Sequence, residues 1–433
     1  MLAEAATTYA EWRRAATDER SEALAAIAAA LTLHRDRLAD VATREMGKLP
    51  AEAASEVEKC AWLARHYAEH LAGYLRPRAV PGPGSRAEVH VQPMGVVLGV
   101  MPWNFPYWQV ARFAFAALAC GNVAALKHAP NVQECAEALA GLIREATGRD
   151  LLVNLRVRDE YVAEHLIAAP EVVGVACTGS ERAGRAVGAA ASKYLKPSVL
   201  ELGGSDAYLV LADADPEAAA RTIAAARALN AGQSCISPKR VIVVDAAYAS
   251  FAARLREACA VYGFRQNQRS GSGARELAPL ARPDLAEELH RQVEASVAAG
   301  ATALLGGSAP TEQNPCRYPF TLLADLTAGM PAAEEELFGP VIALLRAADE
   351  AEAIALANDT RFGLGAAVFT RNVARGYDLA RGGLEAGAVV VNGAVASDPR
   401  LPFGGIKSSG YGRELAREGL LAFANVKTVV VST

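Results

Sequence analysis

Hydrophobic and polar positions divide the chain into a helical start and a long region of strands and helices. Residues 8–72 are rich in Ala, Leu, Glu and Arg, with apolar positions at helical spacing, which predicts helices. Prolines and glycines between 77 and 84 break this pattern. Residues 86–92 alternate between apolar and polar side chains, as a strand with one solvated face does. Residues 96–101 are nearly all apolar and predict a buried strand.

From residue 96 onward, predicted strands and helices follow one another, which favours an α/β fold with parallel sheets. A second α/β layer is expected after about residue 205, and the polar residues 261–279 predict a long surface loop. The apolar segment 427–431 is expected to pair with the strand near residue 90 or with a neighbouring subunit. Further strands are predicted at 122–127, 172–177, 198–202, 207–211, 240–244, 301–305, 341–346, 365–369 and 388–391, and helices at 107–119, 132–147, 214–230, 247–260 and 284–300.

Composition limits the classes of function. A chain of 433 residues with 52% hydrophobic residues can bury the cores of two or three domains. A net charge of −4 gives no electrostatic reason to bind nucleic acid or an anionic membrane. We see neither a secretory signal nor an apolar run approaching the roughly 20 residues that span a bilayer. The seven cysteines are odd in number and widely spaced, which favours a reducing, cytoplasmic location.

Two residues on predicted loops carry the strongest chemical signal. Cys235 follows Gly232 and Gln233, and Glu201 ends an apolar run just before two glycines. A thiol nucleophile and a carboxylate base are the minimum needed for acyl chemistry through a thioester. Taken singly, each residue is also compatible with a buried structural cysteine or an ordinary solvated glutamate.

Other polar residues follow predicted strands. Asn104 lies between Trp103 and Phe105, which suits an oxyanion donor in a dry site, although an Asx turn is the alternative. Lys127 ends a strand, and residues 178–180 (Thr-Gly-Ser) begin a helix after another strand. Both positions suit contacts to phosphate and ribose, with a solvated lysine and a plain helix cap as alternatives. No GxGxxG fingerprint is present.

One short motif points to a metal. His66-Tyr67-Ala68-Glu69-His70 matches an HxxEH zinc pattern that places both histidines on one helical face. No third ligand is evident, and short motifs without context have many false matches. We therefore expect no metal site.

Seven motifs stand in a characteristic order along the chain. They are Pro102-Trp103-Asn104-Phe105-Pro106, Lys127-His128-Ala129-Pro130, Thr178-Gly179-Ser180, Glu201-Leu202-Gly203-Gly204, Gly232-Gln233-Ser234-Cys235, Glu336-Leu337-Phe338-Gly339-Pro340 and Pro402-Phe403-Gly404-Gly405-Ile406-Lys407-Ser408-Ser409-Gly410. In this order they resemble the aldehyde dehydrogenase superfamily over nearly the whole chain. Segments such as Lys127 to Val132 are most similar to the bacterial succinate-semialdehyde dehydrogenases.

This resemblance implies two Rossmann-like parallel-sheet domains and a small β arm for oligomerisation. Residues 1–74 and 94–204, with 409–423, would form the cofactor-binding domain. Residues 205–408 would form the thiol-bearing catalytic domain. The strands of 75–93 and 424–433 would assemble a homodimer or homotetramer.

The resemblance also implies roles for individual residues. Cys235 would be the nucleophile, Asn104 would hold the oxyanion, Glu201 would activate water, and Glu414 would be an auxiliary carboxylate near Glu201. The cofactor would contact Trp103, Lys127, Pro130, Gly179, Ser180, Leu202, Gly203, Glu336 and Phe338. The aldehyde substrate would contact Arg112, Trp108 and Ser397.

The expected reaction is NAD(P)-dependent oxidation of succinic semialdehyde or a similar short semialdehyde to the acid. Arg112 would pair with the far carboxylate, with a surface arginine as the alternative, although Leu229 occupies the place of a second arginine used by such enzymes. Pro130 stands near where NAD-preferring relatives carry a glutamate, so NADP is at least tolerated. Neutral aliphatic or aromatic aldehydes are an alternative. A degenerate, non-catalytic homologue is another, because residues 148–154 depart from the family's loop beside the adenine pocket.

Overall fold

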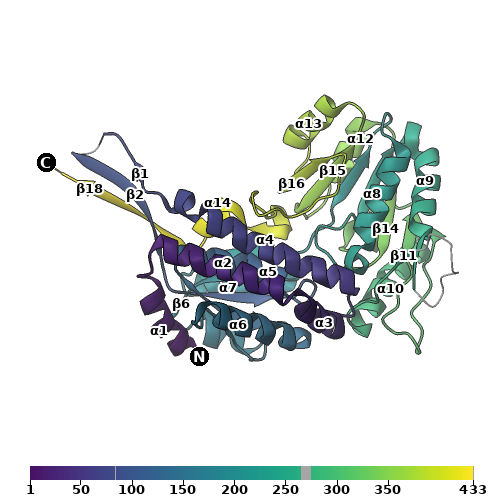
Figure 1. The fold of residues 1–433 in the computed structure, drawn as a ribbon. Coiled ribbons are helices and arrows are strands. Elements are labelled where there is room, and N and C mark those ends of the chain that lie inside the picture. The colour runs from purple at the N-terminus through teal and green to yellow at the C-terminus, as the bar shows by residue number, and fades with distance from the viewer. Residues whose placement is uncertain (83, 265–274, 433) are drawn as a thin grey trace.

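The computed structural model describes residues 1–82, 84–264 and 275–432, and these form two large sheets with a projecting arm (Figure 1). The first sheet has six strands in the order β17-β7-β6-β3-β4-β5. Its pairs are parallel except for β17, which runs antiparallel to β7. The strands are β3 (Val96–Met101), β4 (Val123–His128), β5 (Leu152–Asn154), β6 (Val172–Thr178), β7 (Ser198–Glu201) and β17 (Gly410–Tyr411).

Helices of the N-terminal half, with two short helices from near the C-terminus, pack around this sheet and share one hydrophobic core with it. The long helix α4 begins with Pro50 at its first turn, where a missing N–H costs nothing, and packs against α2, α3 and α5. The helices are α1 (Leu2–Trp12), α2 (Thr17–Leu33), α3 (Arg35–Met46), α4 (Pro50–Leu75), α5 (Trp108–Cys120), η1 (Pro130–Val132), α6 (Gln133–Thr147), η2 (Val162–Ile167), α7 (Glu181–Lys193), η5 (Lys407–Ser409) and α14 (Ala416–Leu421).

The second sheet follows in the chain and has its own hydrophobic core. Within the described residues its strand order is β12-β13-β14-β9-β8-β15-β16, parallel except for β12 against β13. Its strands are β8 (Ala207–Val210), β9 (Arg240–Val244), β12 (Thr302–Leu305), β13 (Thr321–Ala324), β14 (Val341–Ala347), β15 (Gly365–Phe369) and β16 (Ala388–Val391). Its helices are α8 (Pro216–Ala228), η3 (Leu229–Gly232), α9 (Asp245–Ala260), α10 (Pro283–Ala298), α11 (Pro331–Glu334), α12 (Glu350–Asn358) and α13 (Val373–Gly382).

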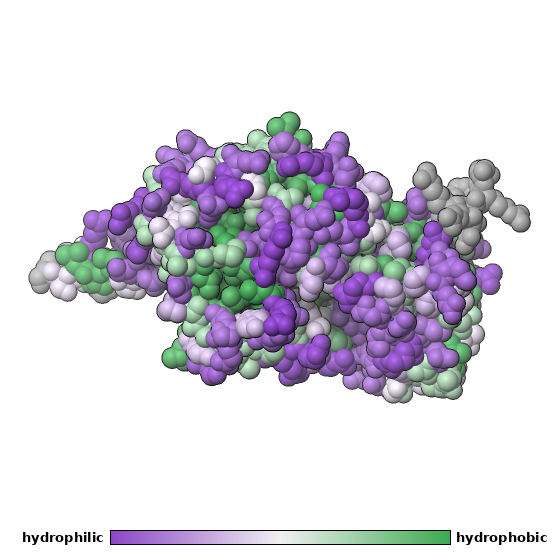
Figure 2. Space-filling model, turned by 90° about the horizontal axis from the view of Figure 1, so that it is seen from below, coloured by the Kyte–Doolittle hydropathy of each residue, from purple (hydrophilic) through white to green (hydrophobic). Residues whose placement is uncertain are grey.

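The arm consists of β1 (Arg78–Ala79), β2 (Arg86–Pro93) and β18 (Ala424–Val431), and it projects away from both sheets (Figure 1). Strand β18 pairs antiparallel with β2, which confirms the pairing expected for the C-terminal segment. Apolar side chains gather on the arm (Figure 2), and Val426, Val429, Val430 and Val431 are between 40% and 56% exposed. Strands β10 (Tyr262–Gly263) and β11 (Arg275–Glu276) form a separate, short parallel pair.

The α/β class and the parallel sheets are confirmed, and three details differ from the sequence predictions. The helix predicted at 214–230 ends at Ala228, because Asn230 and Ala231 take left-handed conformations. The predicted loop 261–279 contains β10 and β11 at its ends, and residues 265–274 lie outside the described residues. Elements β5, β13, α12 and α13 were not predicted. No helix among the described residues is long and apolar enough to cross a membrane.

Candidate active site

The loop that carries Cys235 begins with a tight left-handed turn after α8. Asn230 and Ala231 both have φ of 53°, and Gly232 has φ of 72°. A Cβ on Gly232 would lie 2.3 Å from the carbonyl oxygen of Gly339, so only glycine fits. Left-handed backbone at a non-glycine residue is strained and persists only where its surroundings hold it in place. The turn thus fixes the path of the chain into Cys235.

Asn104 is fixed beside this loop. Its side-chain amide donates to the Gln233 carbonyl at 3.1 Å, and the Asn230 amide donates to the Asn104 carbonyl at 2.8 Å. The Gln233 side chain in turn accepts a hydrogen bond from the Ala281 backbone at 2.9 Å. Asn104 is only 4% exposed. The structure therefore places the predicted oxyanion donor in a dry position next to the cysteine loop.

Cys235 is partly buried. Burial raises its pKa to about 12, with Arg112 and Lys239 acting in the opposite direction. At neutral pH the resting group is therefore the neutral thiol, and a base must take its proton before it can attack an electrophile.

Sequence reasoning missed Lys239, which lies beneath the same loop. Its fully buried ammonium donates to the carbonyl oxygens of Ser234 at 3.0 Å and Cys235 at 2.5 Å. It also lies 3.2 Å from a carboxylate oxygen of Glu336. The only signal in the sequence was a lysine directly before the apolar strand β9.

Two buried carboxylates lie on the side of the six-stranded sheet. Glu201 ends β7 and is 3% exposed, and neither of its carboxylate oxygens has a hydrogen-bond partner among the described residues. Burial raises the pKa of Glu201 well above its usual value, the charge of Glu414 raises it further, and Arg112 and Arg413 oppose the shift. Burial also raises the pKa of Glu414, against the opposing effect of Arg112. The alternative of an ordinary solvated glutamate at position 201 is therefore excluded.

Arg112 is 2% exposed, which rules out the alternative of a surface arginine. Its Nε lies 2.7 Å from an oxygen of Glu414, and its Nη2 donates to the Thr178 hydroxyl at 3.4 Å. The guanidinium also stacks 4.8 Å from the centre of the Phe403 ring. The positive charge of Arg112 is therefore already ion-paired with the carboxylate of Glu414.

A cavity of about 450 Å³ opens beside Cys235. Its walls include the apolar residues Phe105, Ile236 and Phe403, together with Arg112, Trp108 and Ser397. The Trp108 indole donates to the Ser397 hydroxyl at 3.1 Å. Apolar walls with a few fixed polar groups are typical of a site for a small organic molecule. The three residues predicted to contact substrate therefore share one cavity with the thiol.

A second cavity of about 450 Å³ covers the carboxyl ends of β3, β4 and β6. Trp103, Lys127, Pro130 and Gly179 line it, as the sequence predicted for a cofactor site. Such a crevice at the carboxyl ends of parallel strands is where nucleotides bind in α/β folds. Lys127 is ion-paired there with Asp159, a residue that sequence reasoning did not single out.

The remaining predicted cofactor residues line neither of these two cavities. Ser180 caps α7 by accepting from the Ala183 N–H at 3.3 Å. Glu336 accepts from the Gly204 N–H at 3.0 Å, and Phe338 meets Trp103 edge to face at 5.8 Å. Gly203 and Leu202 are packed tightly, with a Cβ on Gly203 falling 2.3 Å from Glu336 and Leu202 fitted against Gly184 of α7.

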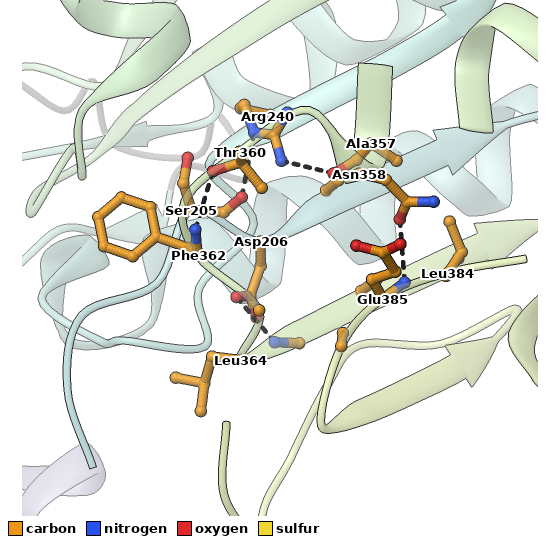
Figure 3. Close-up of a pocket in the computed structure, with 15 residues that line it drawn as sticks. Ser205, Asp206, Arg240, Ala357, Asn358, Thr360, Phe362, Leu364, Leu384 and Glu385 are labelled. Carbon is orange, nitrogen blue, oxygen red and sulfur yellow. Dashed lines mark hydrogen bonds between the residues drawn. The ribbon is translucent and has the colours of Figure 1, made fainter. Parts of the chain in front are cut away.

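A very small cavity lies beside Ser205 and Asp206, and hydrogen bonds among the residues around it hold the 203–206 loop in place (Figure 3). Asp206 accepts from the Gly365 N–H at 3.0 Å, and burial raises the pKa of Asp206 to about 7. Arg240 donates to the carbonyls of Ser205, Leu356 and Ala357. These bonds tie the loop after Glu201 to the seven-stranded sheet.

The HxxEH histidines take part in local contacts on α4. Their rings stack at 4.4 Å, His66 hydrogen-bonds the Tyr74 hydroxyl at 2.9 Å, and His70 bonds the His66 carbonyl. In the described parts of the chain, no group of three or more His, Cys, Asp or Glu side chains is placed to hold a metal ion.

Comparison with known proteins agrees with this geometry. A protein named as a probable NADP(+) succinate-semialdehyde dehydrogenase from Synechocystis is 43% identical over 98% of this chain and 92% of its own length. An Escherichia coli protein named as an NAD(P)+ succinate semialdehyde dehydrogenase is 41% identical over 98% and 91%. The crystal structure of a Streptococcus pyogenes succinic semialdehyde dehydrogenase with NADP+ matches with a TM-score of 0.93, at 35% identity, over 100% of this chain and 94% of its own. The model of the aldehyde dehydrogenase family matches residues 1–429, and the chain belongs to that family.

Proposed function

We propose that this protein oxidises succinic semialdehyde, or a similar short semialdehyde, to the carboxylic acid with NADP or NAD. The observation that carries the proposal is the convergence of Cys235, Asn104 and a cation-bearing cavity. The buried Glu201 is coupled to this site through Arg112, whose charge lowers the pKa of both Glu201 and Cys235. The names of the relatives support both the substrate and the use of NADP.

The crevice over β3, β4 and β6 fits a dinucleotide. A Cβ at Gly179 would meet nothing closer than 3.7 Å, so the crevice is open where α7 begins. Lys127 and Glu336 would hold ribose hydroxyls, Ser180 would meet the pyrophosphate at the helix N-terminus, and Phe338 would pack near the nicotinamide. Trp103, Pro130, Gly179, Leu202 and Gly203 would shape the remaining walls.

The chain's own groups then account for the chemistry. The Cys235 thiol first gives its proton to the Glu201 carboxylate, which releases it to solvent. The thiolate then attacks the aldehyde carbon, and the Asn104 amide with the Cys235 N–H stabilises the oxyanion of the thiohemiacetal. The bound cofactor supplies the hydride acceptor that converts this adduct to a thioester. Glu201 takes a proton from water, which attacks the thioester and releases the acid.

Glu414 and Arg112 adjust the basicity of Glu201 from opposite sides. The charge of Glu414 raises the pKa of Glu201, and Arg112 lowers it. Because a general base works best with a pKa near the working pH, this balance suits a carboxylate that must accept a proton at neutral pH.

Two further parts of the proposal concern location and assembly. All seven cysteines lie in the described residues and are free, which supports a reducing compartment such as the cytoplasm. The exposed valines of the arm support a homodimer or homotetramer built through β2 and β18. Light scattering of the purified protein measures the subunit number, and a monomer would contradict this part.

The test is formation of reduced cofactor with succinic semialdehyde and with butanal, each with NAD and with NADP. We expect the highest kcat/KM with succinic semialdehyde, and NADP to be at least as good a cofactor as NAD. A preference for butanal would favour the alternative of a neutral aldehyde substrate, which the apolar residues of the cavity wall support. A folded protein that turns over neither aldehyde would indicate a non-catalytic homologue.

A further inference from the structure

A lysine that no sequence motif singled out faces the substrate cavity. Lys59 lies on α4 and lines the same cavity as Cys235. Its ammonium donates to the Ser397 hydroxyl oxygen at 2.9 Å and lies 4.6 Å from the centre of the Trp108 ring. Its side chain is therefore held in place by two residues of the cavity wall.

The other cations near this cavity are already matched by carboxylates. Arg112 is ion-paired with Glu414, and Lys48 is ion-paired with Glu56 at 2.5 Å. Among the described residues, no carboxylate lies within ion-pair distance of Lys59. The cavity wall also includes Glu52 and Glu56, but Glu56 is bound to Lys48 and to the Tyr107 and Trp108 N–H groups. Lys59 thus brings to the cavity a positive charge without a direct ion-pair partner among the described residues, and such a charge is costly unless something compensates it.

The Ser397 hydroxyl completes the arrangement. Its oxygen accepts hydrogen bonds from both Lys59 and the Trp108 indole, which occupy its acceptor sites. The hydroxyl proton must therefore point away from both, and Ser397 lines the cavity. An ammonium and a hydroxyl side by side offer a carboxylate two donors, one of them charged.

We propose that Lys59, together with the Ser397 hydroxyl, binds the carboxylate at the far end of the substrate and so selects ω-carboxy aldehydes. This inference rests on the proposed function. It adds a lysine of α4 to the charge recognition that the sequence placed on Arg112 of α5. It also explains how the site works with Leu229 in place of a second arginine.

The arrangement has a consequence for pH. Burial, and after it the charge of Arg112, lower the pKa of Lys59 to about 8, against the opposing effects of Cys60, Asp398 and Glu56. Only the protonated ammonium attracts a carboxylate. The preference for succinic semialdehyde over butanal should therefore fall as the pH rises through about 8. Taking the ratio of the two substrates removes the titrations of Cys235 and Glu201, which both reactions share.

The test is Lys59→Met, which keeps the length of the side chain and removes its charge. We expect KM for succinic semialdehyde to rise about 10- to 100-fold, the range for losing a hydrogen bond to a charged group, and KM for butanal to change less than about twofold. The pH dependence of the substrate ratio should disappear in this variant, and Lys59→Arg should restore part of the preference. The matched control is Lys193→Met, an exposed lysine on α7 paired with Glu164, which should behave as wild type.

A second measurement does not depend on turnover. Succinate, the expected product, should raise the melting temperature of the wild-type protein and of Lys193→Met, but not that of Lys59→Met. An unchanged substrate ratio and an unchanged response to succinate in Lys59→Met would overturn the role of Lys59. A wild-type enzyme that prefers butanal and ignores succinate would overturn the proposed function itself, and with it this inference.

Discussion

Glu201 and Lys239 are buried on opposite sides of the loop that carries Cys235, and they differ in their hydrogen-bond partners. Toward the six-stranded sheet, neither carboxylate oxygen of the buried Glu201 has a hydrogen-bond partner among the described residues. Toward the seven-stranded sheet, the buried Lys239 has two backbone carbonyls and the Glu336 carboxylate as partners. Both side chains are buried to a similar degree, yet only Lys239 has direct hydrogen-bond partners among the described residues.

We infer that this difference separates a reactive group, Glu201, from a supporting one, Lys239. An uncompensated buried carboxylate has a high affinity for a proton, which is what a base acting on a thiol or on water requires. The ammonium of Lys239, by contrast, is hydrogen-bonded to the carbonyls of Ser234 and Cys235, and it therefore holds this backbone in place. Changes on the two sides should therefore separate activity from stability.

The largest effect is expected for Cys235→Ala. Without the thiol no covalent adduct forms, so oxidation of every aldehyde should be abolished. Because Cys235 does not line the proposed cofactor crevice, NADP binding should be retained. Turnover assays and titration of tryptophan fluorescence with NADP measure the two properties. Residual turnover well above background would remove Cys235 from the mechanism.

The next effect is expected for Glu201→Gln. Loss of the base should lower the steady-state kcat about 10²- to 10⁴-fold, the usual contribution of general base catalysis. Because the raised pKa of Glu201 makes it a base only above that pKa, the wild-type kcat should fall as the pH decreases through it. The variant should lose this limb of the profile. Stopped-flow detection of reduced cofactor and pH profiles measure both, and an unaltered pH limb would assign it to another group.

Lys239→Met tests the supporting side and should act mainly on folding. Removing one partner of a buried charge pair costs about 3–5 kcal/mol, and here two carbonyls and Glu336 lose their donor. Urea unfolding measures this loss, and the activity of the folded fraction should fall less than in Glu201→Gln. A stable Lys239→Met protein with the same kcat loss as Glu201→Gln would erase the contrast between the two sides.

The smallest effect is a gain in stability in Glu201→Gln. The raised pKa of Glu201 means that its contribution to stability is fully present below the unfolded value, near 4.5, and is lost as the pH rises through the folded value. The glutamine in Glu201→Gln does not ionise, so the variant does not lose this stability at high pH. The melting temperature of Glu201→Gln should therefore exceed that of wild type at pH 8 and approach it at pH 4. A constant difference across this range would show that Glu201 does not titrate abnormally.

Much of the fold could be predicted because the signals were local. The strand at 96–101, the helix after it and the alternation beyond it follow from apolar patterning within short windows. The short strand β13 and the helices α12 and α13 could not, because their few apolar residues become informative only when packed on the seven-stranded sheet.

The sequence by itself determined the family and the parallel sheets, and it singled out Cys235, Glu201 and Asn104 as candidate site residues, since each stands in a short motif beside a strand or turn. Only the tertiary structure decided how charges pair across the site. Arg112 meets Glu414, and Lys59 meets Ser397, because α5, α4 and the C-terminal segments converge on one cavity. Such contacts join residues far apart in the chain, and their energies depend on burial and on neighbouring charge, which no local pattern records.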